Sequence, residues 1–274
     1  MRSSRTAAVV GLPIGHSLSP VIHTAWLEAA GIDGRYLALA PSSPAELVEL
    51  LESGTLIGCN VTAPYKPDAF RWARERGAET GPEALATGSV NLLVLGECPQ
   101  AWSTDGQGLI AAIRARVPDH DFSRGPTVIL GAGGAASAAV HALRSEGSTD
   151  IRVVNRTRER AAALADRLGP GVSAWPLDAV AEALEGGHML INAASHVDSP
   201  NLGGMARDAV VMDMSYRPLT TPLLAAAEAG GLITVDGLAM LIGQARPSFS
   251  ALFGCEVPDV DVRSRCLKVL EGYG

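Results

Sequence analysis

Apolar and polar positions along this chain follow two alternating patterns. Runs of about four to seven mostly apolar residues, bounded by glycine, proline or small polar residues, are typical of buried strands. Longer stretches with apolar residues at helical spacing, opened by Ser, Thr or Asp or closed by Gly, are typical of helices. The pattern predicts strands at residues 6–10, 35–40, 56–61, 89–95, 127–130, 151–154, 189–192 and 209–213. It predicts helices between residues 19 and 31, 43 and 54, 105 and 113, 135 and 145, 158 and 168, and 221 and 229, and a mostly helical segment, 238–270.

Strands and helices that alternate in this way predict an α/β fold with parallel sheets in doubly wound layers. The segment 117–126, rich in Pro, Asp and Gly, is typical of a connection between two such runs. The chain has 274 residues, 47% of them hydrophobic, and a single hydrophobic core usually stops growing at about this length. We therefore expect two domains.

Composition and charge exclude several partners. A net charge of −7 offers no basic field for nucleic acid. The six histidines are dispersed, so no metal site is expected. Four cysteines without a C-x-x-C pair favour reduced thiols in a cytoplasm; they are Cys59, Cys98, Cys255 and Cys266.

The N-terminus has two arginines followed by an apolar stretch, which superficially resembles a signal peptide. Gly11 and Pro13 interrupt that stretch early, and no small-residue cleavage site follows. No apolar run reaches the length that crosses a bilayer. We expect a soluble, cytoplasmic protein that makes no membrane contact.

The strongest local motif is the segment GAGGAA at residues 131–136, which fits G-x-G-x-x-[GA]. It follows the apolar strand TVIL and opens an alanine-rich helix, which is the context that a dinucleotide site requires. Gly131 would turn the chain, Gly133 would let the backbone approach a pyrophosphate, and Ala136 would permit close helix–strand packing. This context favours cofactor binding over an ordinary tight turn.

The next strand indicates which cofactor binds. An NAD site places Asp or Glu at the end of that strand to hold the ribose diol, whereas this chain continues as Asn155-Arg156-Thr157-Arg158-Glu159-Arg160. Guanidinium groups there can hold a 2′-phosphate. The alternative is a solvated helix start, but arginine is poorly suited to the positive end of a helix dipole. The pattern therefore favours NADP.

Polar residues in the N-terminal half lie where predicted strands give way to loops. They are Ser17 and Ser19 after the first strand, Asn60, Thr62 and Lys66 around the end of the third, then Asn91, Ser103, Thr104 and Asp105, with Gln244 near the C-terminus. Sites of α/β sheets usually lie at such strand ends.

Eight stretches together resemble the motifs of the shikimate dehydrogenase family, in the family's order and over nearly the whole chain. They are GLPIGHSLSPVIH, GCNVTAPYK, TGSVNLL, STDGQG, GAGGAA, NRTRER, DMSYRP and DGLAMLIGQA. The resemblance implies reversible NADPH-dependent reduction of 3-dehydroshikimate to shikimate, a step towards chorismate and the aromatic amino acids.

The resemblance also implies roles for individual residues. Ser17 and Ser19 would bind the substrate carboxylate with Tyr216 nearby, and Asn60, Thr62, Asn91 and Gln244 would bind the ring hydroxyls. Lys66 and Asp105 would flank the carbon that changes oxidation state. The cofactor would contact Gly131, Ala132, Gly133, Gly134, Ala135, Asn155, Arg156, Thr157, Arg160, Met214, Gly237 and Met240.

A pair of lysine and aspartate also suits the chemistry without the family. A hydride that reaches a ketone leaves an alkoxide, which needs a cation and a proton donor, and an ammonium held by a carboxylate supplies both. Each residue has a plainer alternative: Ser19 and Asp105 as helix caps, Lys66 as a solvated lysine, Asn60 as a satisfied turn residue. Their joint occurrence favours the functional interpretation.

The sequence departs from the family's commonest pattern at a few positions. Thr24 replaces an Asn, Leu92 a Thr and Ser103 an Asn, and the stretch from Asn192 to His196 lacks the usual ending. Leu92 and Ser103 adjoin residues assigned to the ring, so the choice of substrate stays open. The departures at residues 193–196 concern the edge of the cofactor pocket.

Several alternatives remain open. A quinate or aminoshikimate dehydrogenase would differ by one substituent on the same ring. An NADP-linked folate dehydrogenase would not explain the paired serines with Gln244. A catalytically silent NADP-binding sensor would be expected to lack Lys66 or Asp105.

We expect an N-terminal α/β substrate domain, 1–104, a Rossmann-type NADP-binding domain, 105–241, and C-terminal helices, 242–274, that return to the first domain. A homodimer is possible because homodimers are common, although nothing in the sequence marks an interface.

Overall fold

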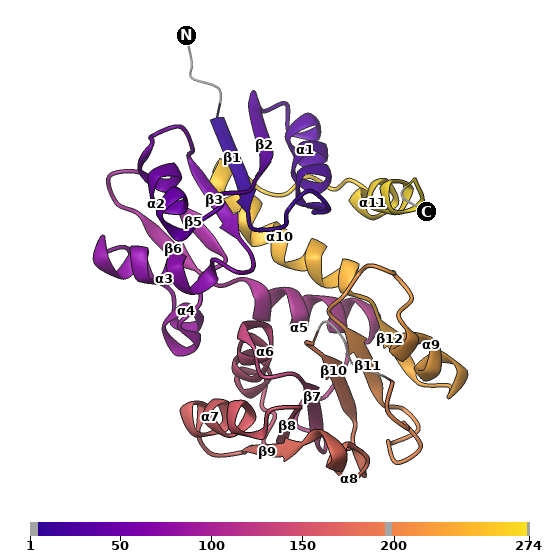
Figure 1. Cartoon of the computed structure of the whole chain (residues 1–274). Coiled ribbons are helices and arrows are strands. Elements are labelled where there is room, and N and C mark those ends of the chain that lie inside the picture. The colour runs from indigo at the N-terminus through magenta and orange to yellow at the C-terminus, as the bar shows by residue number, and fades with distance from the viewer. Residues whose placement is uncertain (1–4, 195–198, 273–274) are drawn as a thin grey trace. The chain divides into compact units, whose positions relative to one another are not determined.

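The computed structural model describes residues 5–194 and 199–272 (Figure 1). The chain divides into two compact units. Unit 1 combines Met1–Thr104 with Leu241–Gly274, and unit 2 is Asp105–Met240. Because unit 1 draws on both ends of the chain, the polypeptide passes between the units twice.

The sheet of unit 1 has the strand order β2-β1-β3-β5-β6-β4. The strands are β1 (Arg5–Val10), β2 (Gly34–Leu39), β3 (Gly58–Val61), β4 (Glu79–Thr80), β5 (Leu92–Val94) and β6 (Gln100–Trp102). β1 pairs in parallel with β2 and β3, but β5 is antiparallel to both β3 and β6. The prediction of a parallel sheet therefore holds for β2, β1 and β3 but is wrong for β5. Residues 95–99 are too few for the crossover that parallel pairing of β5 with β6 would need.

Helices of unit 1 bury apolar side chains against the sheet or against another helix. They are α1 (Ser19–Ala29), α2 (Pro44–Glu52), α3 (Lys66–Glu75), α4 (Pro82–Thr87) and α11 (Val262–Glu271), with the part of α10 (Gly237–Phe253) that follows Met240. One core layer joins Leu47 of α2, Trp72 of α3 and Ala84 of α4 to Val61 and Leu93 of the sheet. These contacts hold in place the loops that follow β1 and β3.

The start of α2 shows how the sequence directs local structure. Ser43 is the N-cap, and its side chain accepts a hydrogen bond from the backbone N–H of Glu46 at 3.2 Å. The carboxylate of Glu46 accepts from the N–H and hydroxyl of Ser42 rather than returning to Ser43. The arrangement thus differs from a standard capping box by one residue on the carboxylate side.

Unit 2 contains a fully parallel sheet in the order β12-β11-β10-β7-β8-β9. The strands are β7 (Thr127–Leu130), β8 (Ile151–Asn155), β9 (Val172–Pro176), β10 (Met189–Asn192), β11 (Val210–Asp213) and β12 (Ile233–Val235). This is the strand order of dinucleotide-binding Rossmann folds, in which the direction of winding reverses between β7 and β10. The prediction of a Rossmann-type domain is confirmed.

The two faces of this sheet are covered by different helices. These are α5 (Asp105–Arg116), α6 (Gly134–Ser145), α7 (Arg158–Leu168), α8 (Val180–Leu184), which follows the short 3-10 helix η1 (Leu177–Ala179), and α9 (Pro222–Ala229). Alternate residues of β7 illustrate the division: Ile129 packs in the core with α5, α6 and α7, whereas Val128 and Leu130 pack in the core with α8 and α9. No helix within the described ranges is long and apolar enough to cross a membrane.

Candidate functional site

The glycine loop of unit 2 leads from β7 into α6. Gly131 is buried, has φ +105°, and its N–H donates to the carbonyl of Val154 at 2.8 Å. A Cβ on Gly131 would lie 3.2 Å from the carbonyl carbon of Ala193, the residue that follows β10. Glycine is therefore required both by backbone conformation and by the close approach of two strand ends at the reversal point.

The start of α6 is open in a way that suits a phosphate. Gly133 is the N-cap and offers no side-chain acceptor, and a Cβ there would meet no atom within 4 Å. Gly133 and Gly134 are exposed, with Ala132 and Ala135 half-buried beside them. The first N–H groups of α6 can therefore donate to phosphate oxygens, aided by the helix dipole.

The end of β8 has the chemistry expected for a 2′-phosphate. The strand ends at Asn155, whose Nδ2 donates to the carbonyl of Thr157 at 2.8 Å. Arg156, Arg158 and Arg160 are exposed, and none of them forms an ion pair with a described residue. Three guanidinium groups without acidic partners, at a strand end without a carboxylate, fit NADP better than NAD.

A buried carboxylate organises the loop that follows β11. Asp213 accepts hydrogen bonds from Asn192 Nδ2 at 3.1 Å, Thr221 Oγ1 at 2.8 Å and the N–H of Ser215 at 2.9 Å. Thr221 in turn caps α9 by accepting from the N–H of Leu224. The loop that carries Met214 and half-buried Tyr216 is thereby tied to the ends of β10 and β11 and to the start of α9.

Two more residues assigned to the cofactor lie close to this loop. A Cβ on Gly237 would be 2.4 Å from the carbonyl oxygen of Met214 and 2.5 Å from that of Ser215, so α10 begins in direct backbone contact with the loop. Met240 is buried in the core shared with α5 and α6, and Met214 packs against that core. Both methionines therefore have a packing role, and their contact with the cofactor stays a prediction.

In unit 1 the loops after β1 and β3 lie against each other. The N–H of Leu12 donates to the carbonyl of Ala63 at 3.0 Å, and a Cβ on Gly11 would be 2.4 Å from Cγ2 of Thr62. The loop after β1 carries Ser17, whose Oγ accepts from the N–H of Ser19 at 3.3 Å. The structure thus brings together two of the loops that carry predicted substrate ligands.

The expected capping role of Ser19 is wrong. Leu18 is the N-cap of α1 and makes no side-chain cap bond, while Ser19 and Pro20 are the first helical residues. Proline at this position explains the sharp helix start without a serine cap. The hydroxyl of Ser19 is consequently not engaged in capping.

A hydrogen-bond network joins the residues predicted to bind the ring. Asn91 is buried; its Nδ2 donates to Thr104 Oγ1 at 3.1 Å and to Gln244 Oε1 at 3.3 Å, and its Oδ1 accepts from the N–H of Thr104 at 2.8 Å. Asn60 Nδ2 donates to the carbonyl of Asn91 at 3.0 Å and to Ser248 Oγ at 2.9 Å. Three of the predicted ligands, Asn60, Asn91 and Gln244, are therefore one connected group within unit 1.

The two residues predicted to be catalytic both begin helices. Lys66 is the first residue of α3, half-buried, and Asp105 is the first residue of α5, buried. Aspartate suits the positive end of a helix dipole, but lysine does not. The position of Lys66 is therefore unfavourable for helix stability alone, which favours a chemical role. Lys66 belongs to unit 1 and Asp105 to unit 2.

The departures from the family pattern have structural explanations in part. Ser103 Oγ donates to Glu83 Oε1 of α4 at 2.6 Å, which ties β6 to that helix. Leu92 is buried in β5 opposite Asn60, and Thr24 is exposed on α1. Of the stretch 193–196, residues Ser195 and His196 lie outside the described residues.

Sequence reasoning missed several residues that hold the site. Tyr36 and Ser248 bond to Asn60, and Asp213 and Thr221 hold the loop of Tyr216. Thr104 was noted only for its position, although it bonds both Asn91 and the carbonyl of Gln244. The sequence does show polar residues within apolar strands and helices. It does not show which residue each of them bonds.

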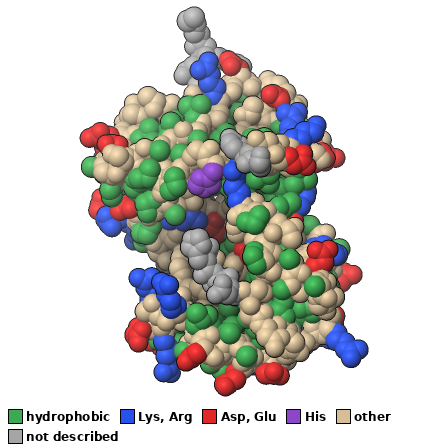
Figure 2. Space-filling view, turned by 45° about the vertical axis from the view of Figure 1, so that its right-hand side comes forward, with side chains coloured by type: hydrophobic (Ala, Val, Ile, Leu, Met, Phe, Trp, Pro, Cys, Tyr) green, Lys and Arg blue, Asp and Glu red, His purple; other side chains and the backbone are tan. Residues whose placement is uncertain are grey.

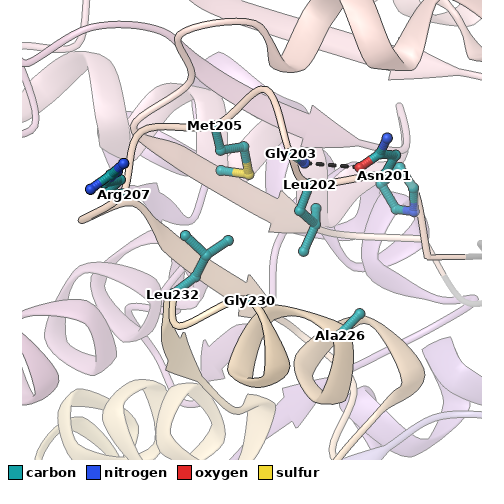
Figure 3. A pocket seen from close by; sticks show the side chains of 9 residues that line it. Asn201, Leu202, Gly203, Met205, Arg207, Ala226, Gly230 and Leu232 are labelled. Atoms are coloured by element: carbon teal, nitrogen blue, oxygen red, sulfur yellow. Dashed lines mark hydrogen bonds between the residues drawn. The ribbon is translucent and has the colours of Figure 1, made fainter.

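Other features of the described residues lie apart from these loops. A hollow of about 460 Å³ is lined mainly by the segment 200–207 and by Ala226, Gly230 and Leu232 (Figure 3). Leu232 directly precedes β12, so the hollow is at the amino edge of the sheet, opposite to the edge where Gly131 lies. No cluster of three or more His, Cys, Asp or Glu within the described ranges could hold a metal. Figure 2 shows acidic and basic side chains interspersed on the face it presents.

The fold and the loops define a class: an α/β protein with a Rossmann-type dinucleotide-binding unit and a second α/β unit that carries a polar network. Comparison with known proteins specifies the family. The model of the shikimate dehydrogenase substrate binding domain matches residues 9–93, and that of shikimate / quinate 5-dehydrogenase matches residues 114–214. The chain belongs to the shikimate dehydrogenase family.

Individual relatives extend over nearly the whole chain. The NADP(+) shikimate dehydrogenase of Caulobacter vibrioides (strain NA1000 / CB15N) is 44% identical, covering 96% of this chain and 94% of its own. A crystal structure of shikimate 5-dehydrogenase from Thermus thermophilus with NADP(H) and shikimate has 32% identity and TM-score 0.81, covering 97% of this chain and 99% of its own. A quinate dehydrogenase from Corynebacterium glutamicum in complex with NAD has 25% identity and TM-score 0.83, covering 98% and 99%.

Proposed function

We propose that this protein catalyses the reversible NADPH-dependent reduction of 3-dehydroshikimate to shikimate, an oxidoreductase reaction at a CH–OH group. The observation that carries the proposal is the end of β8 in a chain 44% identical to an NADP-linked shikimate dehydrogenase. Asn155 and three arginines that form no ion pair with a described residue lie there. Quinate-type oxidation with NAD would call for an acidic residue at this strand end.

The cofactor supplies the hydride when bound, and the chain's residues would hold it at the carboxyl edge of the Rossmann sheet. Gly131 and Gly133 allow the backbone to approach the pyrophosphate, and the N–H groups that open α6 donate to it. Arg156 and Arg160 would bind the 2′-phosphate, with Asn155 and Thr157 shaping the strand end. The fit depends on the open space in front of Gly133.

Lys66 would supply the proton at the reacting oxygen. As the ketone carbon is reduced, negative charge develops on its oxygen, and the ammonium of Lys66 stabilises that charge and donates the proton. Asp105 would keep the amine oriented and charged through its carboxylate. In the oxidation direction the neutral amine accepts the hydroxyl proton.

Substrate binding would use the loops of unit 1. Ser17 and Ser19 donate hydroxyl hydrogens suited to a carboxylate, with Tyr216 as a further donor. Thr62 and Gln244 provide a hydroxyl and an amide suited to ring hydroxyls. Asn91, whose Nδ2 donates to Thr104 and Gln244, would offer its Oδ1 as an acceptor. A buried polar site of this kind discriminates strongly, because a substrate that lacks one hydroxyl leaves protein groups unpaired.

Quinate or aminoshikimate oxidation within the same family is the second candidate. It stays open because Leu92, an apolar residue where a Thr is frequent in the family, lies opposite Asn60. A cytoplasmic location stays a prediction. A homodimer also stays a prediction, and sedimentation equilibrium of the purified chain measures the oligomeric state.

The test is formation of reduced nicotinamide by the purified protein with shikimate or quinate, each combined with NADP or NAD. Fast turnover with shikimate and NADP alone is the expected result. Activity with quinate, or with NAD, would move the protein to the second candidate. Absence of turnover in every combination would contradict the proposal and favour an amino-substituted substrate or a silent NADP-binding sensor.

A further inference from the structure

Asn60 has no amide hydrogen left for a ligand. One Nδ2 hydrogen goes to the carbonyl of Asn91 at 3.0 Å and the other to Ser248 Oγ at 2.9 Å, while Oδ1 accepts from the hydroxyl of Tyr36 at 2.7 Å. An amide has two donors and one acceptor oxygen. Both donors are therefore spent inside the protein, which conflicts with a role for Asn60 as a hydrogen-bond donor to the ring.

The partners of Asn60 come from three different elements. Tyr36 on β2 reaches across β1 to β3, since β1 lies between those strands in the sheet. Its ring is buried and stacks on His23 of α1, with 3.9 Å between ring centroids and 3° between ring planes. This packing holds the ring of Tyr36 in the place from which its hydroxyl donates to Asn60.

On the other side, Ser248 carries the connection to α10. Ser248 is fully buried, and its hydroxyl donates to the carbonyl of Gln244 one turn earlier at 3.1 Å. The same carbonyl accepts from Thr104 Oγ1 at 3.1 Å. The backbone of Gln244 is thus held from two directions, by β3 through Ser248 and by the segment after β6 through Thr104.

This arrangement determines how Gln244 can meet a ligand. Its Oε1 accepts from Asn91, and no described residue accepts from its Nε2. The side chain of Gln244 is half-buried, so the Nε2 hydrogens remain to donate to an oxygen of a bound molecule. Asn91, whose carbonyl is bonded to Asn60, fixes which end of the Gln244 amide acts as the donor.

We propose that Asn60 is a positioning residue: held by Tyr36, it sets Asn91 directly and Gln244 through Ser248, so that Gln244 presents its amide hydrogens to a ring hydroxyl of the substrate. The proposal rests on the proposed function for the identity of the ring. It replaces the expectation that Asn60 itself binds a hydroxyl.

Two substitutions cut the chain of hydrogen bonds on opposite sides of Asn60. Tyr36→Phe and Ser248→Ala should each raise KM for shikimate about five- to tenfold, the loss expected for one buried hydrogen bond. KM for NADP should not change, because the network lies in unit 1. The matched control is Ser250→Ala, since Ser250 lies about 200° further round the same helix and outside the network.

The double variant separates positioning from general damage. Since both substitutions act through one amide, their combined effect on kcat/KM should be smaller than the product of the single effects. If each substitution instead weakened the core independently, the two effects on kcat/KM would multiply. The inference would be overturned if Tyr36→Phe and Ser248→Ala had the same KM for shikimate as the control Ser250→Ala.

A second readout does not depend on turnover. The side-chain amide signals of Asn91 and Gln244 in NMR spectra should shift in Tyr36→Phe and Ser248→Ala but not in Ser250→Ala. If the wild type shows no turnover with shikimate and NADP, the proposed function fails while these spectra still decide the network. Unshifted amide signals in both variants would contradict the positioning role even in an active enzyme.

Discussion

At the scale of single residues, the position of Lys66 is better explained by a role in the reaction than by the stability of its helix. It begins α3, where the positive end of the helix dipole opposes a cation, and helix stability therefore does not explain it. Its neighbours Tyr65 and Ala69 are buried in the core of unit 1, so the backbone beneath it is rigid. A proton donor must be held in a fixed position relative to the reacting oxygen, and a firmly packed backbone provides that.

We predict that Lys66→Ala lowers kcat about 10²- to 10⁴-fold, the usual contribution of a positioned proton donor, while the Kd for NADP stays within about twofold. Steady-state kinetics and fluorescence titration with NADPH measure the two quantities. Lys268→Ala, on exposed α11, is the control, since Lys268 is the chain's other lysine. Unchanged turnover in Lys66→Ala would exclude the proposed mechanism.

His23 makes a residue-scale prediction about pH. Burial lowers the pKa of His23 from 6.5 to about 3, because it removes water from the charged form. Between these values the unfolded chain binds a proton that the folded protein does not, so the free energy of unfolding falls as pH falls. The expected loss from pH 7.5 to pH 5 is about 2 kcal/mol for this residue.

Urea unfolding of the wild type and His23→Phe at both pH values measures that difference. Phenylalanine keeps an aromatic ring against Tyr36 but cannot titrate, so the loss on acidification should be about 2 kcal/mol smaller in the variant. Equal losses in the two proteins would mean that His23 gains its proton in the folded state as readily as in the unfolded chain.

At the scale of elements, the glycines that begin two helices have different tasks. A Cβ on Gly133, before α6, would meet open space, whereas a Cβ on Gly237, at the start of α10, would lie within 2.6 Å of the backbone of Met214 and Ser215. Gly133 therefore leaves room for something outside the chain. Gly237 leaves room for the chain itself.

We predict that Gly133→Ala leaves the free energy of unfolding within about 0.5 kcal/mol of the wild type and raises the Kd for NADP at least about tenfold. Gly237→Ala should instead lower the free energy of unfolding by about 1–3 kcal/mol, because the loop must shift. Chemical denaturation and NADPH titration of both variants test the contrast. If Gly133→Ala changed neither the free energy of unfolding nor the Kd for NADP, the pyrophosphate would not bind at Gly133.

At the scale of the molecule, each unit has a hydrophobic core of its own, and the residues predicted to contact the cofactor all lie in unit 2. NADP at about one hundred times its Kd should stabilise the folded state by about 2.7 kcal/mol. We predict that amide hydrogen exchange slows mainly within Asp105–Met240, above all around Gly131 and Asn155. NAD at the same concentration should protect less. Equal protection by NAD and NADP would indicate that the arginines after β8 do not bind a 2′-phosphate.

The elements that local pattern predicted well share a physical cause. β7, β10 and β11 are short, fully buried strands bounded by turn residues, and α6, α7 and α9 begin and end with clear signals. Where one strand's own side chains are apolar on both faces, sequence alone indicates a covered parallel sheet. The glycine loop was likewise predictable, because the spacing of its glycines between a strand and a helix is set by the local backbone conformation.

Elements without their own hydrophobic pattern were missed. β4, β6, β9 and β12 are short or only partly buried, and α3, α4 and α8 are short or strongly polar. Such segments become strands or helices because a neighbour pairs with or packs on them. The antiparallel pairing of β5 arises in the same way, from the short turn to β6.

By itself the sequence determined the alternating α/β plan, the glycine loop, the absence of an acid at the end of β8 and the family, because each depends on short stretches of neighbouring residues. Only the tertiary structure decided that Asn60 is bonded to Tyr36, Asn91 and Ser248, and that Asp213 holds the loop of Tyr216. Hydrogen bonds between residues as far apart as 188 positions depend on how strands and helices pack. A local pattern contains no record of that packing, since every polar residue offers the same donors and acceptors whichever partner it meets.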